Sequence, residues 1–336
     1  MPAARAGFVQ TMALISLAAL LGAGPASAQL SLRTKATSAQ EIVVSANPLA
    51  AEAGALVLRD GGNAIDAAIA VQAVLGLTEP QSTGIGGGGF LLHFEAATRA
   101  VTSFDARETA PAAATPFYFY NASSQPLALP AAVLSGRSVG VPGIVKLWEA
   151  MSRRHGSQPL ARVLQPAIEL ATTGFSISPR LAAAIEGSKA NLAQDPGAAA
   201  YFLNADGTGK AAGTILQNPA YAQTLGRIAF AGARAFYQGP VAQDIVTTVT
   251  SDPRPGGPGA MTLADLANYQ VIERTPVCGN YRVYVVCGMG PPSSGGIATL
   301  QMLGILDRVD LAALGPDTAQ TVHAILQANR LAFADR

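Results

Sequence analysis

The expected fold of this chain is clearest in residues 84–111, which read GIGGGGFLLHFEAATRAVTSFDARETAP. Residues 90–94 are almost continuously apolar, and residues 101–104 are rich in β-branched and aromatic side chains. This pattern predicts two strands joined by the short turn at 95–99. A nearly continuous apolar strand is typical of one that is covered on both faces. The second strand then ends in a loop that carries Arg107.

The glycine run at 84–89 precedes the first strand. It lacks the Gly-Lys-Ser/Thr ending of a phosphate-binding loop, and it leads into a strand where such a loop would open a helix. A nucleotide site is therefore not expected here. The glycines indicate close packing of backbone under a tight turn.

Arg107 follows the second strand directly and has Asp105 and Glu108 as near neighbours. Its planar guanidinium is suited to gripping a carboxylate with two hydrogen bonds. The local chemistry taken alone favours the alternative, a structural ion pair with Asp105 or Glu108. Both readings stay open at this point.

Two helices are expected before the glycine run. Asn47, followed by proline, and Asn63 are both suited to cap a helix. The second helix, which ends near residue 78, is apolar over most of its surface, which predicts a position inside the core.

The N-terminus has the features of a cleavable export signal. Arg5 precedes an apolar segment at 12–21, and Ala26-Ser27-Ala28 fits the small-residue cleavage pattern, so we expect residues 1–28 to be removed after Ala28. A retained membrane anchor is the alternative. Over the full 336 residues, the formal net charge of +1 and the 13% of charged residues give no reason to expect binding to nucleic acid or to an anionic membrane.

Cys278 and Cys287 are the only cysteines of the chain. Export permits a disulfide between them, but two separate buried thiols fit equally well. Gly279-Asn280 is typical of a turn that precedes a strand at 281–286. The three histidines, at 93, 155 and 323, show no ligand spacing, so no metal site is expected.

Many short motifs stand in an order that resembles the large subunit of the γ-glutamyltransferase (glutathione hydrolase) family, from about residue 41 to the last residue. They are the segments at 60–67, 79–81, 86–90, 105–111, 141–143, 165–167, 236–239, 261–266, 273–276, 291–296 and 334–336. The resemblance implies an α/β fold, an αββα sandwich of the N-terminal-nucleophile hydrolase type that is incomplete in this chain. It also implies that Arg107 binds the α-carboxylate of the substrate.

In that family a precursor cleaves itself before a threonine, which then attacks a γ-glutamyl amide such as glutathione. The γ-glutamyl-enzyme passes its acyl group to water or to an amino-acid acceptor, and no cofactor is implied. The pairs Thr172-Thr173 and Thr247-Thr248 do not resemble the cleavage motif. The resemblance therefore implies that the catalytic threonine is absent from this chain, that residues 29–336 stop before the cleavage site, and that the chain alone is inactive without the small subunit.

Other functions remain open. A same-fold acylase acting on a β-lactam side chain, or an enzyme of a poly-γ-glutamate capsule, would share the motifs; Arg107 favours a free glutamyl α-carboxylate and argues against the acylase. A non-catalytic binding domain or an inactive fragment is the alternative from another class. Ser293-Ser294 is interpreted as loop structure, because no histidine stands near it in the pattern. The export signal predicts a periplasmic or secreted protein.

Overall fold

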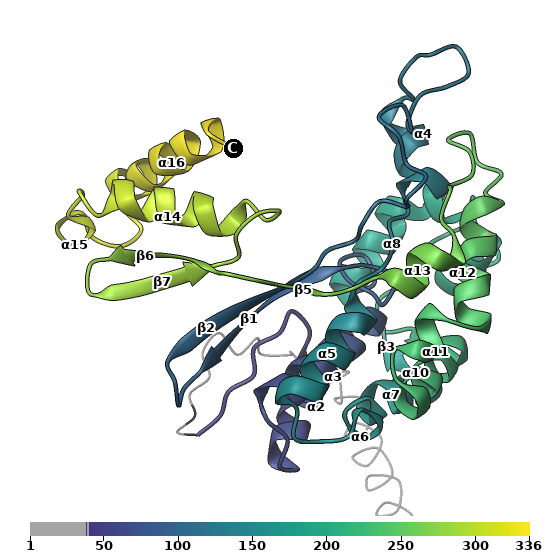
Figure 1. The fold of residues 1–336 in the computed structure, drawn as a ribbon, viewed down its shortest axis with the longest axis horizontal. Coiled ribbons are helices and arrows are strands. Elements are labelled where there is room, and N and C mark those ends of the chain that lie inside the picture. Colours follow the sequence, from purple (N-terminus) through teal and green to yellow (C-terminus); the bar gives the residue numbers. More distant parts are fainter. Residues whose placement is uncertain (1–37, 39) are drawn as a thin grey trace, which may run out of the picture. The chain divides into compact units, whose positions relative to one another are not determined.

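The computed structural model describes residue 38 and residues 40–336 (Figure 1). The chain divides into a unit of Met1–Ile42 and a unit of Val43–Arg336, and the second is described below. The predicted signal peptide, residues 1–28, lies outside the described residues. None of the described helices is long and apolar enough to cross a bilayer.

Helices and short strands alternate along the second unit. The strands are β1 (Gly89–Glu95), β2 (Ala100–Ala106), β3 (Phe175–Ser176), β4 (Ile215–Leu216), β5 (Ile272–Arg274), β6 (Val277–Tyr281) and β7 (Tyr284–Gly288). The helices are α2 (Pro48–Arg59), α3 (Ala64–Thr78), α4 (Leu129–Val133), α5 (Ile144–His155), α6 (Leu160–Val163), α7 (Gln165–Thr173), α8 (Pro179–Leu192), α9 (Pro196–Phe202), α10 (Pro219–Ala231), α11 (Arg234–Tyr237), α12 (Pro240–Thr250), α13 (Leu263–Asn268), α14 (Gly295–Leu306), α15 (Leu311–Leu314) and α16 (Ala319–Ala334), with a 3₁₀ turn η1 (Gly136–Ser138).

The predicted hairpin is confirmed. β1 and β2 pair in antiparallel register from Gly89 opposite Ala106 to Glu95 opposite Ala100. β5 adds to the other side of β2, also antiparallel, so the order is β1-β2-β5 (Figure 1). β2 is therefore the central strand, and the loop that follows it begins at an interior position of the sheet.

The helix caps predicted from the sequence are also confirmed. The Asn47 side chain accepts a hydrogen bond from the Leu49 amide at the start of α2. Asn63 and Asp66 form a reciprocal capping box at the start of α3. As its composition predicts, α3 is largely buried and belongs to the main hydrophobic core.

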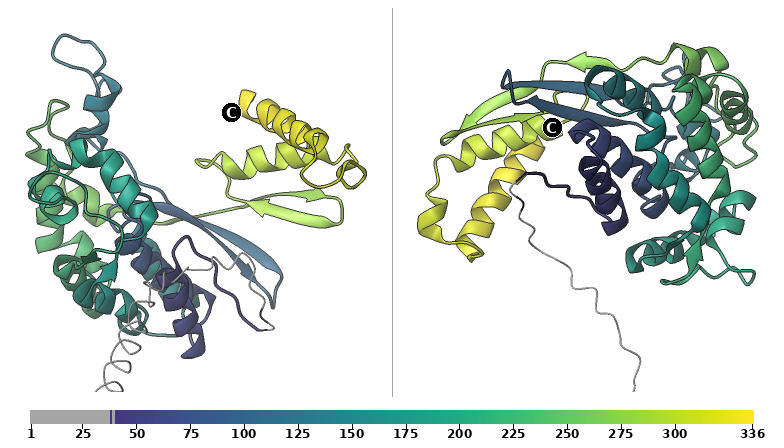
Figure 2. Two further views of the ribbon diagram at one scale, coloured as in Figure 1. Left: turned by 180° about the vertical axis from the view of Figure 1, so that it is seen from behind. Right: turned by 90° about the horizontal axis from the view of Figure 1, so that it is seen from below.

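That core joins α3 and α5 to one face of the hairpin, and helices α10–α12 contribute to it; Figure 2 shows these elements from two further sides. Phe104 of β2 is only 4% exposed within it. On the opposite face of β1, Leu92 is 44% and Phe94 59% exposed, because alternate side chains of a strand point to opposite sides. The prediction that this strand is covered on both faces is therefore wrong for the part of the chain that the structure describes.

A second, smaller core lies around α7, α8 and the β3–β4 pair. Phe175, Leu181 and Leu216 are among its buried side chains. Neither core cluster includes a described residue beyond Val271. The segments that follow pack among themselves, with α14 against α16 and against the β6–β7 hairpin.

The β6–β7 hairpin settles the question of the two cysteines. Cys278 lies directly opposite Cys287, and the two form a disulfide. The turn expected at Gly279-Asn280 is wrong, because both residues lie inside β6 and the chain turns after Tyr281. A Cβ atom on Gly279 would stand 3.2 Å from the Leu300 side chain, so the glycine allows close packing of α14 on the hairpin.

Candidate substrate site

The structure places Arg107 one residue beyond the end of β2. Its side chain is 58% exposed and its Nε lies 3.4 Å from Oε2 of Glu108. An ion pair this exposed contributes little to stability, since water and salt screen it. The arginine can therefore exchange Glu108 for another carboxylate at little cost.

Asp105, the other candidate partner of Arg107, is already used. Its Oδ2 accepts a hydrogen bond of 2.8 Å from Nε of Arg274 on the neighbouring β5. Its Oδ1 accepts from the backbone amide of Arg107 at 2.9 Å, so the same carboxylate fixes the backbone at the end of β2. Of the two partners for Arg107 that the sequence suggested, the structure therefore pairs it with Glu108, whereas Asp105 pairs with Arg274.

Glu108 also ties the glycine run to this loop. The Gly88 amide donates a hydrogen bond of 2.7 Å to Glu108 Oε1. A Cβ atom on Gly88 would stand 2.5 Å from the Ala106 carbonyl oxygen and 2.7 Å from the Glu108 amide nitrogen. Only glycine fits there, so the sequence-based interpretation of close backbone packing is confirmed at Gly88.

Gly143, just before α5, is packed still more closely. A Cβ atom at this position would stand 2.0 Å from the Ala106 carbonyl oxygen and 2.3 Å from the Tyr269 hydroxyl. That hydroxyl donates a hydrogen bond of 2.8 Å to the Arg107 carbonyl. Burial, together with Asp105 and Glu108, raises the pKa of Tyr269 to about 12, so the hydroxyl keeps its proton at neutral pH.

Arg107 opens into a cavity of about 710 Å³, which lies within the range of small-molecule sites. Loop residues after β2 and the segment around η1 line it, among them Glu108, Thr115 and Ser138. Arg137 lies in the same wall, but its guanidinium donates to the carbonyls of Tyr118 and Tyr120 at 2.8 and 2.9 Å. Arg137 therefore holds the backbone of the cavity wall in place, whereas the guanidinium of Arg107 is available to a ligand in the cavity.

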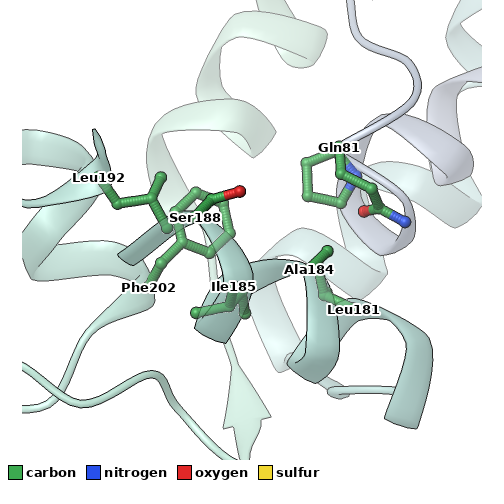
Figure 3. Close-up of a pocket in the computed structure, with 8 residues that line it drawn as sticks. Gln81, Leu181, Ala184, Ile185, Ser188, Leu192 and Phe202 are labelled. Carbon is green, nitrogen blue, oxygen red and sulfur yellow. The ribbon is translucent and has the colours of Figure 1, made fainter. Parts of the chain in front are cut away.

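A second cavity, of about 170 Å³, lies between α8 and the turn that follows α3 (Figure 3). Leu181, Ile185, Leu192 and Phe202 line most of it, and Gln81 stands at one side. It is smaller than usual ligand pockets and none of the described residues that line it is charged, so it is a poor match for a charged amino-acid derivative.

The hydroxyl-bearing pairs singled out in the sequence lie elsewhere. Thr172-Thr173 belongs to α7 and Thr247-Thr248 to α12. Ser293 Oγ accepts from the Gly295 amide, as a turn residue does, and none of the described residues lining the cavity beside it is a histidine. These observations support the interpretation of Ser293-Ser294 as loop structure.

The spacing of the histidines along the chain does not group them, yet the structure brings two of them together. The rings of His93, on β1, and His155, at the end of α5, have centroids 4.3 Å apart. Burial and the nearby charges of His93 and Arg154 lower the pKa of His155. Sixty-two residues separate the two, so no local motif could have revealed the contact.

The fold and the site together define a mixed α/β protein with an arginine-bearing cavity suited to a small anionic molecule. The family model described as gamma-glutamyltranspeptidase matches residues 50–336. The chain belongs to this family.

Individual relatives support this assignment. The chain is 37% identical over 295 residues to the glutathione hydrolase proenzyme of Bacillus subtilis, covering 88% of this chain and 49% of that protein. It is 39% identical over 307 residues to the acylase ACY 1 proenzyme of Pseudomonas sp. strain V22, covering 90% of this chain and 54% of that protein. The chain thus spans about half the length of these curated relatives.

Among solved structures, the γ-glutamyltranspeptidase of Helicobacter pylori superposes with a TM-score of 0.82 at 36% identity. The match covers 90% of this chain and 84% of the chain in that structure. The mixed α/β fold is therefore that of γ-glutamyltranspeptidase structures.

Proposed function

We propose that this chain is the large-subunit portion of a γ-glutamyltransferase precursor that cleaves γ-glutamyl amides, glutathione among them, and passes the acyl group to water or to an amino acid. Family membership and the likeness to a glutathione hydrolase proenzyme support this activity. The catalytic threonine and the oxyanion-binding glycines would come from the small subunit of the same precursor. The reaction uses the threonine and its own α-amine and involves no cofactor.

The single observation that carries the proposal is the placement of Arg107. It stands at the end of the central strand, its backbone is fixed by Asp105 and Tyr269, and its guanidinium opens into the 710 Å³ cavity. A fixed arginine fork binds a carboxylate in one orientation. Held by its α-carboxylate, a γ-glutamyl group presents its γ-amide carbon at a set distance from this anchor, which is how binding orients a substrate for attack.

The small subunit would also complete the sandwich expected for this family. The apolar side chains on the open face of β1, including Leu92 and Phe94, are suited to packing against a second sheet. In this proposal the large subunit supplies the outer helices and one sheet, and the small subunit supplies the layer that carries the nucleophile.

We further propose that the protein is exported, with cleavage after Ala28, and acts in the periplasm or outside the cell. The basic start, the apolar segment at 12–21 and the Ala-Ser-Ala motif support this. An intact mass of exported protein that begins at Gln29 is the expected result. A mass that retains residues 1–28 would contradict it.

Steady-state kinetics of the complete enzyme with a γ-glutamyl anilide test the role of Arg107. Arg107→Ala removes a charge-assisted contact of about 1.5–3 kcal/mol, so KM should rise about 10- to 100-fold. Arg107→Lys should recover only part of this, since an ammonium lacks the fork. Arg227→Ala on α10, also an exposed arginine, is the matched control and should leave KM unchanged. An unchanged KM in Arg107→Ala would remove Arg107 from the site.

The 39% identity to an acylase proenzyme supports a second candidate function, cleavage of a non-amino-acid acyl amide. Two anilide substrates separate the candidates. Glutaryl anilide keeps the carboxylate that Arg107 would bind but lacks the α-amine, and 4-aminobutyryl anilide lacks the carboxylate. A γ-glutamyltransferase should reject both, whereas efficient turnover of glutaryl anilide would favour the acylase.

A further inference from the structure

Three side chains with metal-ligating atoms meet at the turn end of the β1–β2 hairpin. They are His93 and Glu95 of β1 and His155 at the end of α5, and one ligand atom from each lies within 4.8 Å of the others. Two imidazoles and one carboxylate form a donor set that proteins use for zinc and for similar divalent transition ions. Small rotations of the side chains would bring these atoms to the spacing of a common coordination sphere.

The shielding of one ring nitrogen of the half-buried His155 is the second observation. Its Nε2 atom is shielded from solvent and has no hydrogen-bond partner among the described residues. Buried polar atoms are normally satisfied, so an unpartnered one calls for an explanation. The backbone beside it is held in place, because the Asn63 side chain donates to the His155 carbonyl. The His155 ring thus lies beside the His93 ring, and no described residue forms a hydrogen bond with its Nε2 atom.

The charges around the three residues permit a cation. Arg154, the neighbour of His155, is paired with Glu273 of β5, and its guanidinium lies over the Phe104 ring. Its positive charge is therefore largely offset by Glu273. Glu95 is exposed and contributes the negative charge of the group itself.

We propose that His93, Glu95 and His155 bind one divalent transition-metal ion of the zinc class. Imidazole nitrogen favours such ions over magnesium or calcium, which prefer oxygen ligands. The site replaces the expectation, drawn from histidine spacing alone, that the chain has no metal ligands. It goes beyond the proposed function, since the reaction proposed above uses no metal.

The location of this site indicates its role. β1 begins at Gly89, which pairs with Ala106 next to Arg107, and it ends at Glu95. About 20 Å of strand therefore separates the Arg107 site from the proposed metal site. A metal ion bound at the turn end of the hairpin would crosslink β1 to the end of α5. Its effect should be on stability rather than on the binding of a γ-glutamyl donor.

Calorimetric titration of the complete, tag-free protein with Zn²⁺ tests the proposal, together with the visible absorption of Co²⁺ as a reporter of nitrogen ligation. We expect one ion per chain and a rise in melting temperature with added Zn²⁺, because a ligand that binds the folded state stabilises it. His93→Gln and His155→Gln should each weaken binding by more than about tenfold. His323→Gln, which changes an exposed histidine on α16, is the matched control and should bind as the parent does.

Circular dichroism of each variant shows whether it is folded. If His155→Gln does not fold, His93→Gln and Glu95→Gln carry the test, and Glu95 is exposed, so its substitution should be tolerated. Failure of the parent protein to bind Zn²⁺ or Co²⁺ would overturn the proposal. So would binding that His323→Gln weakens as much as the other variants do. Neither result bears on Arg107, whose test is the KM for γ-glutamyl donors.

Discussion

Substitution of Gly143 by alanine should destabilise the protein markedly, although it adds one methyl group. That group would stand 2.0 Å from the Ala106 carbonyl oxygen and 2.3 Å from the Tyr269 hydroxyl, whereas an ordinary contact begins at 3.4 Å. The oxygen would have to move by about 1.4 Å and the hydroxyl by about 1.1 Å, from the differences between these distances. Ala106 is in the central strand, so the backbone itself must shift.

Two contributions set the size of this effect. Overpacking a well-filled interior costs about 1–3 kcal/mol. Loss of the hydrogen bond from Tyr269 to the Arg107 carbonyl adds about 0.5–1.5 kcal/mol. We therefore expect the free energy of unfolding to fall by about 2–4 kcal/mol. The φ of Gly143 is −115°, which any residue can adopt, so the loss arises from lack of space and not from backbone strain.

Urea unfolding followed by circular dichroism measures the change, with equal m-values showing that the same surface is exposed in each variant. Gly187→Ala is the matched control. Gly187 lies within α8, is exposed and has nothing within 4 Å of an added Cβ, so alanine there should raise stability by about 0.5–1 kcal/mol. If Gly143→Ala lost less than about 0.5 kcal/mol, the close approach of α5 to the end of β2 would be refuted.

Three other predictions concern separate parts of the chain. Cys278 and Cys287 should resist iodoacetamide until a reductant is added, and then gain two adducts by mass spectrometry; labelling before reduction would contradict the disulfide. Asp66→Ala should lower the free energy of unfolding by about 3 kcal/mol in urea, because this fully buried carboxylate accepts hydrogen bonds from the Asn63 amide and from the amide and hydroxyl of Ser157. A loss below about 1 kcal/mol would show that water can replace the carboxylate. The hydrogen bonds from Arg254 lower the pKa of Asp252, so the stability that this ion pair contributes is complete above about pH 4 and is lost as the pH falls through the folded-state pKa. As the pH is lowered from 7 to 3, the melting temperature should therefore fall less steeply in Asp252→Asn than in the parent protein. Parallel curves would contradict this.

The sequence predicted best those features that depend on neighbouring residues. The hairpin at 89–106 and the capping residues Asn47 and Asn63 follow from local hydrogen-bonding and side-chain patterns, and all appear in the structure. The position of Arg107 after a strand was likewise readable. Each of these signals lies within a few residues of the feature that it predicts.

Features that depend on distant packing were not predictable in the same way. Gly279 and Asn280 are typical turn residues, but they pair with Val286 and Val285 of β7 and so lie within a strand. Asp105 pairs with Arg274 on the neighbouring strand, so Arg107 pairs with Glu108 instead. No local pattern predicts this choice of partners. The approach of His155 to His93 likewise requires α5 to be laid on β1, which no local pattern records.

The wall that carries Arg107 is assembled mainly from main-chain atoms. Gly88 and Gly143 meet the carbonyl of Ala106 directly, and Tyr269 contacts the Arg107 carbonyl rather than its side chain. Such a framework leaves the side chains lining the cavity, Thr115 and Ser138 among them, free to vary without moving the arginine. Evolution, or a directed library, can therefore change which small molecule fits the cavity while the arginine stays where it is. The two glycines are the positions that such a library should leave alone.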